Sequence, residues 1–143
     1  MLAPHKTGET TADFTGKRVL LAEDNALNAE IAVELLQSIG LKVDWAEDGQ
    51  KAVEMFEKSA PGSYFAVFMD MQMPEMNGCE ACEAIRALDR EDARAVPIIA
   101  VTANAFAEDI TRTTAAGMNG HISKPIDFGA LGETLRDALA GRL

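Results

Sequence analysis

The sequence contains few cysteines, few aromatic residues and few basic residues, and it has no long apolar run. Two cysteines in 143 residues cannot make a disulfide scaffold, and no apolar run approaches the roughly 18 residues that a membrane span requires. Thirteen Lys and Arg against 23 Asp and Glu give a net charge of −10, which disfavours contact with nucleic acid or an anionic membrane. Hydrophobic residues at 48% and charged residues at 25% are ordinary globular values, so a disordered chain is excluded. The length allows one domain with a single core.

The first 16 residues differ in composition from the rest of the chain. They are rich in Thr and poor in apolar side chains, which predicts a flexible leader or linker (1–16) ahead of one domain (17–141). They lack the apolar segment of a secretory signal, so we expect a cytoplasmic protein with reduced thiols. Gly16 and Lys17 suggest a phosphate-binding loop, but Thr11 stands where that motif requires glycine.

Beyond Lys17, short apolar runs alternate five times with segments of helical periodicity. Most of the runs are continuous rather than alternating, which is typical of strands buried on both faces. The order strand, helix, strand predicts an α/β protein with a parallel sheet, right-handed crossovers and helices on both faces. The predicted strands are 19–22, 43–46, 64–69, 97–101 and 121–123, and the predicted helices include Leu27–Ile39, Ala52–Phe56, Cys79–Leu88, 107–116 and Leu131–Leu139.

Polar residues that could bind a ligand or take part in a reaction follow four of the five predicted strands. Glu23 and Asp24 follow the first strand and Asp70 follows the third, whereas Thr102 and Lys124 follow the fourth and fifth. The carboxyl ends of parallel strands form the ligand crevice of open α/β sheets. If the first and third strands are neighbours, Asp24 and Asp70 face each other across that crevice. The plainer alternative, a solvated acidic turn with a helix cap, does not account for Thr102 and Lys124 at matching strand ends.

Three carboxylates in one small site repel one another. At about 5 Å and an effective dielectric constant of about 20, each pair costs roughly 3 kcal/mol. Lys124 and a divalent cation would offset this repulsion, and Mg²⁺ suits a site with few carboxylates because it retains several waters. Carboxylates, Mg²⁺, a lysine and a hydroxyl are the parts of a phosphoryl-transfer site. Asp70 is then a candidate nucleophile that forms an aspartyl phosphate.

Four motifs in this order resemble the receiver domain of two-component response regulators. They are VLLAEDN (19–25), FMDMQMPEMNG (68–78), IIAVTAN (98–104) and ISKP (122–125). The resemblance implies a flavodoxin-like receiver fold with a five-stranded parallel sheet in the order 2-1-3-4-5. It also implies a phosphoacceptor switch in a phosphorelay rather than an enzyme, with intrinsic phosphotransfer and autodephosphorylation. The segment DREDAR (89–94), expected to be a solvated loop, resembles receivers of hybrid histidine kinases.

The resemblance assigns roles to the acidic residues. Asp70 accepts a phosphoryl group from a phosphohistidine on a partner, with Mg²⁺ or Mn²⁺ as the cofactor. Side chains of Asp24 and Asp70 and the backbone carbonyl of Gln72 ligate the metal, and Glu23 acts through a metal-bound water. Lys124 pairs with Asp70 and then with the phosphoryl oxygens.

The resemblance also implies a switch. The Thr102 hydroxyl moves to the phosphoryl group, the Lys124–Pro125 bond is cis, and the side chains of Gln72 and Asn104 tune the lifetime of the phosphoryl group. His121 stands where the best-known members carry Tyr or Phe. It is either the ring that rotates with Thr102 or only a part of the partner-binding face.

The expected partner is a histidine kinase, a His-phosphotransfer protein or both, with an effector that the sequence does not identify. A monomer is expected, with dimerisation on phosphorylation as the alternative. A phosphatase would require Asp at position 72, where Gln72 stands, and a flavin-phosphate loop would be repelled by Glu23 and Asp24. Cys79 and Cys82 are expected to pack rather than to react.

Overall fold

The structure, a computed structural model, describes residues 15–102, 107–123 and 128–139. Five parallel strands form one sheet in the order β2-β1-β3-β4-β5. This confirms the predicted fold, and the predicted strands agree with the observed ones to within two residues. The strands are β1 (Arg18–Ala22), β2 (Lys42–Ala46), β3 (Ala66–Asp70), β4 (Ile98–Thr102) and β5 (Gly120–Ser123).

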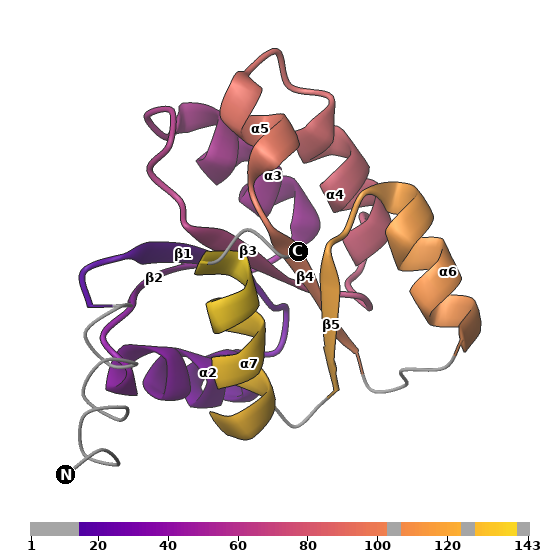
Figure 1. Ribbon diagram of the computed structural model, residues 1–143. Coiled ribbons are helices and arrows are strands. Elements are labelled where there is room, and N and C mark those ends of the chain that lie inside the picture. Colours follow the sequence, from indigo (N-terminus) through magenta and orange to yellow (C-terminus); the bar gives the residue numbers. More distant parts are fainter. Residues whose placement is uncertain (1–14, 103–106, 124–127, 140–143) are drawn as a thin grey trace, which may run out of the picture.

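Helices cover both faces of the sheet. Figure 1 shows α2 and α7 together on one face, α3, α4 and α5 on the other, and α6 beside β5. The helices are α2 (Ala26–Ser38), α3 (Gly49–Lys58), α4 (Gly78–Arg86), α5 (Glu91–Ala95), α6 (Ala107–Ala116) and α7 (Phe128–Leu139). Among the described residues, none of these helices has both the length and the apolar character needed to cross a membrane.

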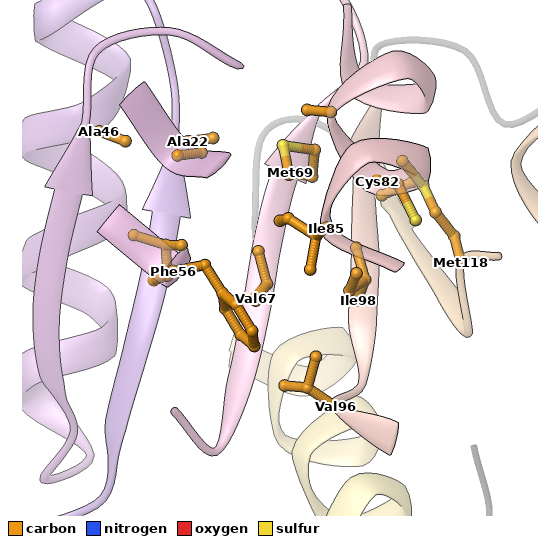
Figure 2. Packing of buried hydrophobic residues seen from close by; sticks show 14 of the residues in the cluster. Ala22, Ala46, Phe56, Val67, Met69, Cys82, Ile85, Val96, Ile98 and Met118 are labelled. Atoms are coloured by element: carbon orange, nitrogen blue, oxygen red, sulfur yellow. The ribbon is translucent and has the colours of Figure 1, made fainter. Parts of the chain in front are cut away.

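Each central strand contributes to two hydrophobic clusters. From β3, Val67 and Met69 pack with α3 and α4, whereas Phe68 packs with α2 and α7. Figure 2 shows the first cluster, with Phe56 of α3 and Ile85 of α4 beside the strand residues. All five residues of β3 and of β4 are buried, which explains why the sequence shows continuous apolar runs there. The packed core therefore fixes the positions of the carboxyl ends of β3 and β4.

The apolar face predicted for the first helix is only partly correct. The structure buries Ala29, Ala32 and Leu36 of α2, while Leu27 is 65% exposed and Ile31 is 49% exposed. Successive residues turn by about 100° around a helix, so apolar residues spaced by four drift by about 40° at each step. The small side chains of α2 instead let the helix lie close to the sheet. Two large apolar side chains are left in solvent at its amino-terminal end.

The expectation of a solvated loop at residues 89–94 is wrong, because this segment contains α5. Ala93 is fully buried. The Arg90 guanidinium donates to the carbonyl oxygens of Phe56 at 2.7 Å and Ser59 at 3.0 Å, and it pairs with Asp92 at 2.7 Å. It also lies 4.9 Å from the centre of the Phe56 ring. Arg90 thereby adds hydrogen bonds to carbonyls at the carboxyl-terminal end of α3.

The chain that leaves β3 returns very close to the strand. Glu75 has a φ of 66°, an uncommon conformation for a residue with a side chain. Gly78, the first residue of α4, donates from its N–H to the carbonyl oxygen of Met71 at 3.1 Å. A Cβ atom at Gly78 would lie 2.5 Å from the carbonyl oxygen of Asp70. Only glycine fits where α4 begins against the end of β3.

We predict that Gly78→Ala lowers the free energy of unfolding by about 1–3 kcal/mol, because the methyl group meets backbone that cannot yield. Gly132→Ala is the matched control. It lies inside α7, where the added methyl would meet only the flexible end of Arg136 at 3.4 Å. That control should raise the free energy of unfolding by up to about 1 kcal/mol. Urea unfolding followed by circular dichroism measures both, and equal stability of Gly78→Ala and wild type would contradict the prediction.

Candidate functional site

Three carboxylates meet at the carboxyl edge of the sheet. Glu23 and Asp24 follow β1, Asp70 ends β3, and the two strands pair with Ala22 opposite Met69. One carboxylate oxygen from each lies within 4.8 Å of the others. Glu23 is 5% exposed and Asp70 is 3% exposed, whereas Asp24 is exposed. The structure thus brings together the acidic residues singled out in the sequence, with one open to solvent.

Hydrogen bonds hold the turn after β1. The Glu23 side chain accepts from the N–H of Asn25 at 3.1 Å, and the Asn25 side chain caps α2 by accepting from the N–H of Asn28 at 3.0 Å. The N–H of Glu23 donates to the carbonyl oxygen of Ala46 at 3.1 Å. The indole N–H of Trp45 donates to the carbonyl oxygen of Glu23 at 2.8 Å. Both the main chain and the side chain of Glu23 are therefore fixed.

The turn after β3 is also held by hydrogen bonds. The N–H of Met71 donates to the carbonyl oxygen of Val101 at 3.1 Å, which extends the pairing with β4 by one residue. The Asp70 carboxylate accepts from the N–H of Gln72 at 3.2 Å. Gln72 itself is exposed. The Gln72 side chain can therefore meet a group that approaches Asp70 from solvent.

Thr102 and His121 lie on one face of the sheet. Thr102 ends β4 and is 7% exposed. Ala100 pairs with His121, and side chains two residues apart on a strand share a face. The His121 ring, half-buried, contacts the hydroxyl of Thr113 on α6, and that hydroxyl lies 3.0 Å from the carbonyl oxygen of Ile110. Burial lowers the pKa of His121. The ring is directed to α6, and its proposed rotation stays a prediction.

Three residues singled out in the sequence, Asn104, Lys124 and Pro125, lie outside the described residues. Trp45 is a residue of the site that the sequence reasoning missed. The signal was weak, a lone tryptophan near the end of a predicted strand, and its contact with Glu23 depends on how β1 and β2 pair.

The cysteines pack between helices, as the sequence suggested. Cys82 is fully buried, its thiol lies 3.3 Å from the carbonyl oxygen of Ala116, and burial raises its pKa to about 11. The Cys79 sulfur lies 4.0 Å from the carbonyl oxygen of Arg112. A thiol with a raised pKa is a poor nucleophile. The Cys82 contact joins α4 to α6.

The residues present fit a hard divalent cation. The cluster offers only carboxylate oxygens, the ligands that Mg²⁺ prefers, and its exposed member leaves room for waters. The fold and this cluster together define an α/β protein with a candidate cation and phosphoryl site at the switch point of its sheet, between β1 and β3.

The chain belongs to the response regulator receiver domain family, whose sequence profile matches residues 19–136. It is 38% identical over 122 residues to hybrid signal transduction histidine kinase L of Dictyostelium discoideum, covering 83% of this chain and 7% of that protein. It is 36% identical over 145 residues to probable histidine kinase 2 of Oryza sativa subsp. indica, covering 94% and 14%. The chain spans less than a fifth of the length of the curated relatives it matches.

Solved structures agree with this assignment. The receiver domain of the sensor histidine kinase PA1611 from Pseudomonas aeruginosa PAO1, with a magnesium ion coordinated in its active site cleft, is 36% identical with a TM-score of 0.78. That similarity covers 88% of this chain and 99% of the other. The receiver domain of Ssk1 of Saccharomyces cerevisiae, solved with the histidine phosphotransfer protein Ypd1, is similar at 27% identity and a TM-score of 0.76, covering 89% and 91%.

We predict that His121 titrates below its ordinary value of 6.5 in the folded chain. Because the folded state then resists protonation, the unfolded chain binds more protons just below pH 6.5, and the free energy of unfolding falls as the pH drops through that window. Above the window this contribution is constant. Nuclear magnetic resonance of the imidazole signals measures the midpoint, and His121→Asn should remove this part of the pH dependence. A midpoint at or above 6.5 would contradict the prediction.

Proposed function

We propose that Asp70 is the phosphoacceptor of this receiver domain. The chain is a receiver domain of a two-component phosphorelay. The observation that carries the proposal is the position of Asp70, a buried carboxylate at the end of central strand β3, within 4.8 Å of two further carboxylates. A carboxylate oxygen of Asp70 would attack the phosphorus of a phosphohistidine, and the imidazole would leave. The carboxylates of this cluster repel a phosphoryl group, so a positive charge beside Asp70 is needed before the nucleophile and the phosphoryl group can meet.

The proposed cation is Mg²⁺, with Mn²⁺ as a substitute. Asp24, Asp70 and the backbone carbonyl of Gln72 would hold it, and Glu23 would act through one of its waters. When bound, the cation neutralises charge between carboxylates and phosphoryl oxygens. Glu23 and Asp70 are buried, and hydrogen bonds from the N–H groups of Glu23 and Met71 fix the strand ends that carry them.

The remaining proposed roles concern the switch. Lys124 would pair with Asp70 and then with the phosphoryl oxygens, and its bond to Pro125 would be cis. The Thr102 hydroxyl would move to the phosphoryl group and shift the balance between two states of α6, β5 and α7. His121 would follow it as the rotating ring. Gln72 and Asn104 would set the rate of autodephosphorylation by flanking the path of the attacking water.

The proposed context is a hybrid histidine kinase or a relay of similar kind in the cytoplasm, since the relatives are kinases far longer than this chain. Residues 1–16 would then be a linker to a neighbouring module and residues 17–141 the receiver domain. The phosphodonor is a histidine kinase or a His-phosphotransfer protein, the class that Ypd1 represents for Ssk1. We propose a monomer before phosphorylation.

We also propose that the phosphodonor docks over the start of α2. A phosphohistidine must reach Asp70 from the carboxyl edge, and α2 begins two residues after Asp24. Leu27 and Ile31 expose their side chains there at 65% and 49%. Apolar side chains left in solvent beside a site are candidates for a protein interface. The partner would cover them while its histidine enters the site.

Phosphorylation by acetyl phosphate tests the acceptor. Wild type should gain one phosphoryl group in the presence of Mg²⁺ and almost none after chelation, since the carboxylates then repel the donor. Asp70→Asn should lose at least 95% of the label, roughly a 20-fold effect in line with the loss of a nucleophile. Intact mass spectrometry under mild conditions measures this. Asp92→Asn, an aspartate in the α5 segment away from the site, is the control, and full labelling of Asp70→Asn would disprove the assignment.

Phosphotransfer tests the docking face. Leu27→Asp and Ile31→Asp should each slow transfer from a phosphorylated His-phosphotransfer protein by about tenfold, the loss expected for one buried anchor. Labelling by acetyl phosphate, which needs no protein contact, should stay within about twofold of wild type. Ile110→Asp on α6, where the side chain is also 40% exposed, is the matched control. Transfer at the wild-type rate in both α2 variants would exclude this face.

A further inference from the structure

The hydrogen-bond ladder between β1 and β2 ends in an unusual way beside the acidic cluster. In this parallel pair the N–H of Lys42 donates to the carbonyl oxygen of Lys17, and the N–H of Glu23 donates to the carbonyl oxygen of Ala46. The same alternation would have the N–H of residue 48 donate to the carbonyl oxygen of Glu23. The chain has turned by then, because Asp48 caps α3. The last carbonyl of the ladder therefore needs a different donor.

The indole of Trp45 supplies that donor. Its N–H reaches the Glu23 carbonyl oxygen at 2.8 Å from the strand next to β1. The pairing of Leu21 with Trp45 puts the indole on the face of the sheet covered by α2. Both backbone polar groups of Glu23 are thus bonded to β2: its N–H donates to the Ala46 carbonyl oxygen, and its carbonyl oxygen accepts from the Trp45 indole.

The hydrogen bond from Trp45 acts on the turn that carries Glu23 and Asp24, two of the three carboxylates that repel one another. Glu23 and Asp24 are adjacent in sequence, and both come within 4.8 Å of Asp70. Like charges at that distance push the turn after β1 away from β3 when no cation is present. The Glu23 carbonyl lies in this turn, directly after β1, and a donor on it fixes the distance between the turn and β2, so the turn cannot shift away from β3 toward β2. A site held in place binds its cation without the cost of reordering.

We propose that Trp45 is a positioning residue for the metal site, setting Mg²⁺ affinity through the Glu23 carbonyl. The proposal rests on the metal site proposed above and adds the residue that holds it in shape before the cation binds. Trp45 is 40% exposed, so its ring is not needed to fill the core. Its contribution is the indole N–H, which donates to the Glu23 carbonyl oxygen at 2.8 Å.

Trp45→Phe in the full chain tests this role, because it keeps an aromatic ring and removes the N–H. Tyr64→Phe is the matched control. It removes one hydrogen bond of similar length, from the Tyr64 hydroxyl to Asp44 at 2.7 Å, on the same edge strand but away from the cluster. Asp44 retains its 2.7 Å ion pair with Arg18 in that variant. Thermal unfolding without Mg²⁺ checks that both variants fold.

Isothermal titration with Mg²⁺ alone is the main measurement. Trp45→Phe should raise the Mg²⁺ dissociation constant by about threefold to tenfold, the range expected for the loss of one hydrogen bond. The dissociation constant of Tyr64→Phe should stay within about twofold of the wild-type value. The Mg²⁺ concentration for half-maximal labelling by acetyl phosphate should rise by the same factor, with an unchanged plateau. A general structural defect would lower the plateau instead.

The outcomes separate the two proposals. Mg²⁺ affinity in Trp45→Phe equal to that of wild type, or an equal loss in Tyr64→Phe, overturns the positioning role and leaves the metal site standing. Wild type that does not bind Mg²⁺ in the millimolar range overturns the metal site itself, and the role of Trp45 falls with it. Weaker binding in Trp45→Phe alone, with an unchanged labelling plateau, supports both.

Discussion

The repulsion among three carboxylates is the constraint on which the functional part of this fold depends. Glu23, Asp24 and Asp70 stay within 4.8 Å of one another because two adjacent, buried strands end at the same edge of the sheet. Each pair at such a distance costs roughly 3 kcal/mol at an effective dielectric constant near 20. Buried ladders, the cap on α2 and the Trp45 indole oppose that repulsion. The site can then accept a cation and one more anion without a shift of the strand ends that carry the carboxylates.

A second group of contacts ties the helices together on the side where a switch would act. The Arg86 guanidinium at the end of α4 donates to the carbonyl oxygen of Gly117 at 2.7 Å and to that of Val96 at 2.7 Å. Cys82 packs its thiol against the last turn of α6, and Thr113 of α6 contacts His121 of β5. Thus α6 is held at its carboxyl-terminal end to the core and at Thr113 to the strand that leads to Lys124.

The net charge of the chain and the exposed apolar side chains of α2 both affect which surfaces can approach the site. The net charge of −10 disfavours contact with other acidic surfaces. The apolar side chains of Leu27 and Ile31, close to Asp24 in the chain, offer contacts that do not depend on charge. Membership in the receiver family and the long kinases among its relatives fit a domain of a two-component phosphorelay.

The sequence by itself determined the alternation of strands and helices, because buried parallel strands have continuous apolar sequences. It also determined the acidic residues at the strand ends, because polar residues directly follow these apolar runs. Periodicity could not find the buried face of α2, since Ala29 and Ala32 are small and Leu27 is large, nor the α5 helix, which is only five residues long. Tertiary structure alone decided that His121 faces Thr113 and that Trp45 reaches Glu23. Both contacts join residues from different elements, and their geometry depends on strand pairing and helix packing that no local pattern encodes.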